Sequence, residues 1–104
     1  MEFHHVGLPT DRKRPGETYL ADARLHVTDA EASPYGIEWL RFEADSPLPE
    51  ILKTSAHVAF KVDDVEAAIA GKEVLLEPFE PMPGIRAAFI LADGAPVEFM
   101  QMMT

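Results

Sequence analysis

The sequence predicts an α+β domain built from two related βαβββ-type modules, with the helix of the first module missing or reduced. Three observations lead to this prediction. A His motif and a Glu motif occur twice in the same order, the second half shows strand and helix patterns in turn, and the first half is shorter between its motifs. We assign module one to residues 1–48, a linker to 49–54 and module two to 55–104, all within one domain.

The repeat consists of two pairs of short stretches. FHHVGLPTD at 3–11 and SAHVAFKVDD at 55–64 both contain His-Val, a small residue, an apolar residue and then Asp. GIEWLRF at 36–42 and PVEFMQM at 96–102 share an aliphatic-Glu-aromatic-aliphatic pattern. The His-to-Glu separation is 33 residues in the first half and 41 in the second, and the difference is about the length of a short helix.

The second half shows its elements most clearly. Residues 56–62 alternate apolar and polar, which predicts a strand with one face on a core. Asp63 as N-cap and Glu66 three positions later predict a helix start, and Gly71 predicts its end. The proline-rich stretch at 77–84 predicts a loop, because proline cannot extend a central strand ladder. Further strands are expected at 72–76, 85–91 and 97–103, with a hairpin turn at Asp93-Gly94.

The first half follows the same order without a helix. After the opening strand, which contains FHHVGLPT at 3–10, the residues at 10–19 have little helical pattern. We expect a strand at 21–28, a turn at 33–36 and a strand at 36–43.

Composition excludes several classes of protein. The chain has no cysteine, so disulfides, thiolate metal sites and a Cys nucleophile are excluded, and a metal would need His, Asp or Glu ligands. A net charge of −9 disfavours nucleic-acid binding. We find no long apolar segment or signal-peptide pattern, and expect a cytoplasmic protein that does not bind membranes. At 104 residues, a homodimer that buries additional surface is expected.

Strand alternation indicates which polar side chains share a face. The apolar face of the strand at 56–62 must cover the helix, so His57 points to the other, concave side of the sheet. The repeat makes His5 its counterpart and places His4 on the opposite face. Glu38 and Glu98 are the equivalent residues of the two Glu motifs.

His5, Glu38, His57 and Glu98 therefore form a candidate metal site. Two imidazoles and two carboxylates suit an octahedral divalent cation and leave two positions for water or substrate. Mg, Mn, Fe, Co, Ni and Zn all accept such ligands, and the sequence does not select among them.

The chain resembles the vicinal oxygen chelate superfamily, which includes glyoxalase I, bleomycin resistance proteins, methylmalonyl-CoA epimerase and extradiol dioxygenases. The stretches HHV, GIEW, AHVAFKVDDVEAAI and APVEF match the family's motifs in order. The resemblance implies a curved mixed β-sheet cup formed by the two modules around a divalent metal such as Ni, Co, Zn, Mn or Fe. It implies His5 and His57 as ligands from the first strands, and Glu38 and Glu98 as ligands from the last.

Other side chains are candidates for substrate contacts. Arg86 opens a strand that should line the cup and is suited to an anionic group, although a surface ion pair is the simpler alternative. His26 is a candidate pocket group, while Met100 and Phe42 are expected in the pocket wall or core. Trp39 faces away from Glu38, and without the first helix we expect it under a loop or in a dimer contact.

The leading interpretation is a metal-dependent lyase or isomerase that acts on a small substrate with vicinal oxygens. The metal would stabilise an enediolate or enolate, and Glu98 or Glu38 would act as the base. A non-catalytic binding or resistance protein of the same fold stays open, as does an extradiol-type dioxygenase. Glu38 argues against the dioxygenase, because a fourth protein ligand occupies a position that oxygen and catechol require.

Overall fold

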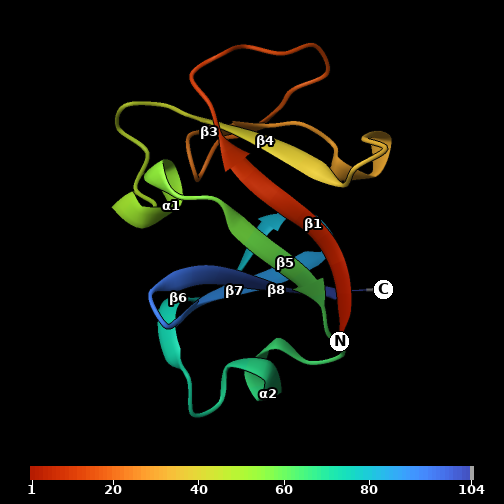
Figure 1. Ribbon diagram of the computed structural model, residues 1–104, viewed down its shortest axis with the longest axis vertical. Coiled ribbons are helices and arrows are strands. Elements are labelled where there is room, and N and C mark those ends of the chain that lie inside the picture. The colour runs from red at the N-terminus through yellow and green to blue at the C-terminus, as the bar shows by residue number, and fades with distance from the viewer. Residues whose placement is uncertain (104) are drawn as a thin grey trace.

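Eight strands form one curled, mixed sheet in the computed structural model, which describes residues 1–103 (Figure 1). The prediction of a small α+β protein with a cup-like sheet is confirmed at this level. The strands are β1 (Glu2–Pro9), β2 (Thr18–Leu20), β3 (Leu25–Val27), β4 (Ile37–Phe42), β5 (His57–Lys61), β6 (Glu73–Met82), β7 (Ile85–Ala92) and β8 (Ala95–Met102). Three short helical segments accompany them: η1 (Ala30–Ala32), α1 (Glu50–Thr54) and α2 (Val65–Ile69).

The two halves of the sheet have the same strand order. The full order is β2-β3-β4-β1-β5-β8-β7-β6, with β1 and β5 antiparallel at the centre. On each side the central strand pairs in parallel with the last strand of its own half, β4 or β8. The two remaining strands of each half follow in antiparallel order. The strands that contain the His and Glu motifs are therefore the four adjacent central strands.

Apolar packing occurs in two clusters. In the second half, Val65 and Ile69 of α2 pack on Ala88, Ile90 and Phe99 of β7 and β8. Phe60 of β5 packs against this cluster, so the strand face opposite His57 lies toward the helix as the alternation predicts, although Val58 on that face is exposed. In the first half, Ala23, Leu25, Val27 and Leu40 form the second cluster. None of the helices in residues 1–103 is long and apolar enough to cross a membrane.

A loop stands where the first half lacks a helix. No helix lies between β1 and β2 in the described chain, and residues 10–17 cross this region instead. The Arg14 guanidinium carbon lies 3.7 Å from the centroid of the Trp39 ring, so the expectation that Trp39 lies under a loop is confirmed. Glu17 accepts hydrogen bonds from Arg41 Nε at 3.0 Å and Nη2 at 2.8 Å. This bidentate pair fastens the loop to β4.

The proline-rich stretch is a strand, not the predicted loop. Strand β6 runs from Glu73 to Met82 through Pro78 and Pro81, and its register with β7 shifts three times. It is the last strand of the sheet, so each proline needs a ladder partner on one side only. The irregular register accommodates the missing N–H groups.

Three local predictions also need correction or refinement. The expected strand at 21–28 is instead a hairpin of β2 and β3, with Arg24 in the turn at φ 48°. The N-cap of α2 is Asp64, not Asp63, because the Asp64 carboxylate accepts hydrogen bonds from the N–H groups of Glu66 and Ala67. Gly71, at φ 74°, follows the end of α2 as predicted. The segment assigned as a linker forms α1, and its Leu52 is buried.

We predict that Asp64→Ala lowers the free energy of unfolding by about 1 kcal/mol, because two N–H groups at the start of α2 lose their acceptor. Urea denaturation measures the change. Asp63→Ala is the matched control and should alter stability by less than about 0.5 kcal/mol. Equal effects of the two variants would contradict the assignment of the cap.

Candidate metal centre

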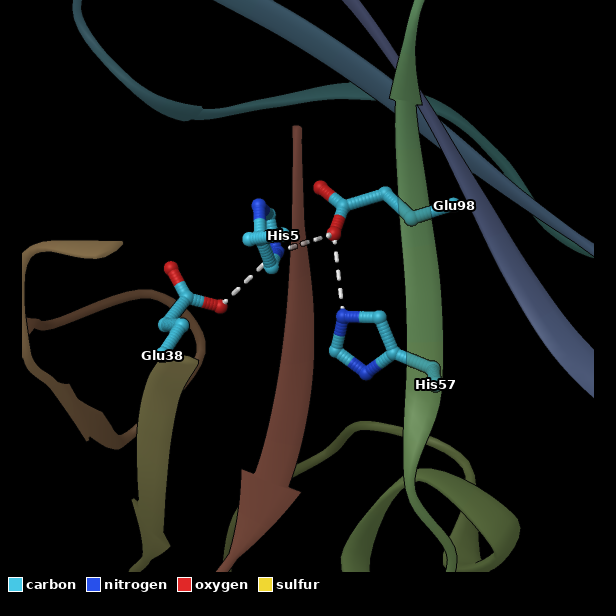
Figure 2. Close-up of side chains that lie close together, drawn as sticks. All are labelled: His5, Glu38, His57 and Glu98. Atoms are coloured by element: carbon cyan, nitrogen blue, oxygen red, sulfur yellow. Dashed lines mark hydrogen bonds and ion pairs between the residues drawn. The ribbon is translucent and has the colours of Figure 1, made fainter. Parts of the chain in front are cut away.

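The four side chains predicted as ligands meet at one point of the sheet. His5, Glu38, His57 and Glu98 each offer one ligand atom, and these atoms all lie within 4.8 Å of one another. They come from β1, β4, β5 and β8, and Figure 2 shows them pointing toward one another. His5, His57 and Glu98 are buried, and Glu38 is half-buried.

Strand register explains how the four groups fit on one face. We use the word row for residues that pair with one another across neighbouring strands. In one row Gly7 of β1 pairs with Glu38 of β4 on one side and with His57 of β5 on the other. In the neighbouring row Ala59 pairs with His5 and with Glu98. Each row therefore holds two polar side chains with a small residue between them.

Gly7 is required by the position of the His57 ring. A Cβ placed on Gly7 would lie 2.2 Å from His57 Cε1, which is far inside van der Waals contact. Ala59 is fully buried between the other two ligands. Neither residue was predicted to contribute to the site, although each is the small residue two positions after the His of its repeated motif.

One carboxylate oxygen links the two imidazoles. Glu98 Oε1 lies 3.1 Å from His57 Nε2 and 3.4 Å from His5 Nε2, and Glu38 Oε1 lies 3.3 Å from His5 Nε2. His5 Nε2 is buried and makes no well-aligned hydrogen bond in the structure. Its lone pair or proton instead faces the space between the two carboxylates.

The charges of the cluster shift two pKa values in opposite directions. Burial lowers the pKa of His5, but the carboxylates of Glu38 and Glu98 outweigh it and raise the pKa to about 9. Burial raises the pKa of Glu98, but His5 and His57 outweigh this effect and keep it below its usual range. The metal-free centre therefore holds an imidazolium between two carboxylates at neutral pH.

A β-bulge brings His4 to the same cluster. Phe3 pairs with Phe60 and His5 with Ala59, so two steps along β1 match one step along β5, and His4 is the extra residue. His4 Nδ1 lies 2.7 Å from His5 Nδ1, and His4 Nε2 lies 3.0 Å from Glu31 Oε2. The expectation that His4 lies on the face opposite His5 is wrong, because the bulge breaks the alternation between them.

A small apolar cavity of about 70 Å³ adjoins the four groups. Phe42 and Met100 line it, together with apolar side chains of both halves. The structure does not bring Arg86 or His26 to this cavity. The Arg86 guanidinium pairs with Glu66, and the His26 ring stacks on Tyr19 beside Glu43.

The four groups fit a divalent cation by their chemistry and position. Two imidazole nitrogens and two carboxylates are ligands that Mn, Fe, Co, Ni and Zn accept, and the carboxylates would neutralise the ion. The buried His5 Nε2, which lacks an aligned partner, faces the centre of the group. The residues can therefore hold a metal without rearrangement of the strands.

Comparisons with known proteins support the fold but name no function. No protein-family model matches the chain, and no curated protein matches its sequence. The chain is similar in structure to the hypothetical protein BH1468 from Bacillus halodurans C-125, with a TM-score of 0.76 and 21% identity. The match covers 99% of this chain and 95% of that one, so the shared fold extends over the whole domain.

We predict that Gly7→Ala displaces the His57 ring and disrupts the cluster. The added methyl group forces a shift that should destabilise the protein by about 1–3 kcal/mol. Urea denaturation and the ring signals of His57 in NMR spectra measure both effects. In a His57→Ala background, where the ring is absent, Gly7→Ala should cost much less stability than it does in the wild type. An equal cost in both backgrounds would show that the methyl group clashes elsewhere.

The raised pKa of His5 predicts that the metal-free protein loses stability in mild alkali. Its imidazolium stabilises the folded state fully below the unfolded pKa of 6.5, and this contribution disappears as pH rises to about 9. The loss is about 3 kcal/mol, or roughly 10–20 °C in melting temperature for a domain of this size.

Thermal melts in a chelator between pH 6 and 10 test this prediction. His5→Gln should flatten the profile, whereas His26→Gln removes an imidazole outside the cluster and should preserve the decline. A His5→Gln profile as steep as that of the wild type would contradict the prediction.

Proposed function

We propose that the protein is a metal-dependent lyase or isomerase of the vicinal oxygen chelate type, which acts on a small substrate with adjacent oxygens. The observation that carries this proposal is the convergence of His5, Glu38, His57 and Glu98 from four adjacent strands beside a cavity. The paired His-then-Glu motifs of the two sheet halves match the family's ligand order. When bound, a divalent ion would polarise the substrate oxygens and stabilise negative charge on them.

The surrounding residues suit a compact substrate. Apart from the four polar groups, the lining of this cavity is apolar, which strengthens electrostatic interactions on this side of the centre. Charged groups such as those of Arg86 and Glu66 lie outside it. The cavity therefore favours an uncharged substituent of few carbon atoms.

The carboxylates supply the candidate base. Glu98 is held by both histidines, whereas Glu38 contacts only His5 and its side chain keeps 18% exposure. Glu38 therefore has more freedom to move toward a substrate C–H group, while Glu98 is held more firmly in place. Either carboxylate can accept the proton in the proposed reaction.

A non-catalytic binding protein of the same fold is the second candidate. The short chain and the loop that replaces the helix of the first half favour it, whereas the complete set of four candidate ligands opposes it. The two candidates differ in whether bound ligands exchange a proton with the protein.

We predict that the purified protein binds one divalent ion among Ni, Co, Zn, Mn and Fe. At an ion concentration 100 times Kd the ion adds about 2.7 kcal/mol of stability, which raises the melting temperature by roughly 10–20 °C. Glu98→Gln and His57→Ala should abolish most of this rise, and His26→Ala should preserve it. A metal-free protein with no shift from any of these ions would overturn the proposal.

Proton exchange then separates the enzyme from the binding protein. In D₂O, the metal-loaded protein should exchange the C–H protons of hydroxyacetone next to its carbonyl group, as measured by proton NMR. Glu38→Gln and Glu98→Gln, assayed at metal saturation, should identify which carboxylate is the base. Metal binding with exchange at the background rate for hydroxyacetone and other small α-hydroxy ketones would favour the binding protein.

A further inference from the structure

We infer that Glu31 and His4 form a positioning relay that fixes the ring orientation and tautomer of His5 for metal binding. This inference rests on the proposed metal site, and it assigns a function to two residues outside the four ligands. The observation behind it is a continuous line of contacts from an exposed carboxylate to the buried centre. Glu31 Oε2 contacts His4 Nε2 at 3.0 Å, and His4 Nδ1 contacts His5 Nδ1 at 2.7 Å.

The Glu31 carboxylate, at the exposed end of this line of contacts, determines which atom donates in each hydrogen bond. The Glu31 carboxylate can only accept, so His4 Nε2 must carry the proton and donate it. A neutral imidazole has one N–H group, which leaves His4 Nδ1 as an acceptor. His5 Nδ1 must then donate to His4 Nδ1. When His5 is neutral, as metal binding requires, its one proton therefore lies on Nδ1, and Nε2 directs a lone pair toward the centre.

The relay opposes a competing arrangement of the same ring. Glu38 and Glu98 both lie close to His5 Nε2, and each would favour a proton on that nitrogen. With its proton there, a neutral His5 could not bind a metal. The acceptor that His4 offers at Nδ1 holds the proton on the far side of the ring instead.

The local fold places both members of the relay. The bulge in β1 turns His4 toward His5. Segment η1 presents Glu31, and the Asp29 carboxylate caps this segment by accepting a hydrogen bond from the Glu31 N–H at 2.9 Å. Ala30 of η1 is buried, so the segment is anchored between β1 and β4.

His57 has no equivalent relay. Its Nδ1 is buried and has no hydrogen-bond partner in the described part of the chain. The ring is confined by Gly7 and by Phe89, whose centroid lies 5.1 Å away. The two proposed imidazole ligands therefore differ, and only the ring of His5 is held by directed hydrogen bonds.

A merely structural role for this pair predicts a different outcome. The Glu31 side chain is 70% exposed, and pairs this exposed contribute little to folding stability. A hydrogen bond that orients a metal ligand typically changes metal affinity by 10- to 100-fold. Loss of the relay should therefore weaken metal binding strongly and change the free energy of unfolding only a little.

Zinc and cobalt affinities, measured by competition with a chromophoric chelator, test the inference. We expect His4→Ala to weaken both affinities 10- to 100-fold. His4→Asn places an amide oxygen near the position of Nδ1 and should restore most of the loss. Glu31→Gln should weaken binding less than His4→Ala, and Glu2→Gln, which removes an equal charge from an exposed residue of β1, should not weaken it.

Nitrogen NMR of the zinc-loaded protein gives a readout independent of activity and affinity. The chain has four histidines, so their ring signals can be resolved. The Nδ1–H proton of His5 should exchange slowly with solvent in the wild type and His4→Asn, and at least tenfold faster in His4→Ala.

The outcomes separate the two proposals. A wild type that binds zinc and cobalt, with unchanged affinity and exchange in a folded His4→Ala variant, overturns the relay and leaves the metal site intact. If His4→Ala does not fold, the His4→Asn variant provides the test. The relay is also overturned if His4→Asn folds but loses at least as much metal affinity as Glu31→Gln does. A wild type that binds neither ion overturns both proposals.

Discussion

Two adjacent rows of the central sheet, each with a small residue between two ligand candidates, are the constraint on which the site depends. Gly7 separates Glu38 from His57, and Ala59 separates His5 from Glu98. Strands in a sheet lie about 4.8 Å apart, so residues two strands apart meet only if the residue between them leaves space above the sheet. The same pairing of β1 with β5 that joins the halves of the domain also aligns these rows, and a shift of one residue would separate the four groups.

Charge balance at the centre links this geometry to chemistry. Two carboxylates beside a buried space require positive charge, because isolated buried charges are strongly unfavourable. With a pKa of about 9, His5 carries a proton that provides this charge at neutral pH when no metal is bound. A divalent cation would provide it instead, and its binding would release that proton. Protons and metal ions therefore compete for one position, and metal affinity should increase as pH rises toward the pKa of His5.

The repeat and the strand alternation were sufficient to predict the four ligand candidates, because both are patterns in the sequence itself, and the family resemblance implied the curved sheet. The sequence was insufficient where a feature depends on a partner strand. The bulge at His4 exists only in the register with β5, and the prolines of β6 are tolerated because that strand lies at the edge of the sheet. The choice of Asp64 over Asp63 as N-cap depends on a backbone turn that two adjacent aspartates do not specify. Gly7 and Ala59 occupy equivalent positions of the repeat in the sequence. That each lies between two ligand candidates can be recognised only from the pairing of three strands.

The two halves share a strand order, yet they hold their histidines in different ways. A steric wall such as the one around His57 restricts where a ring can move, but it does not select which nitrogen carries the proton. A directed hydrogen bond such as the one at His5 does both. The second half has a helix at the position where the first half has a loop, and the first half has the bulge and the capped turn that place His4 and Glu31. Within the proposed site, the strand order that both halves share therefore places the four ligand candidates. The features that only the first half has, the bulge and the capped turn, determine that His5 is the imidazole whose orientation is fixed for metal binding.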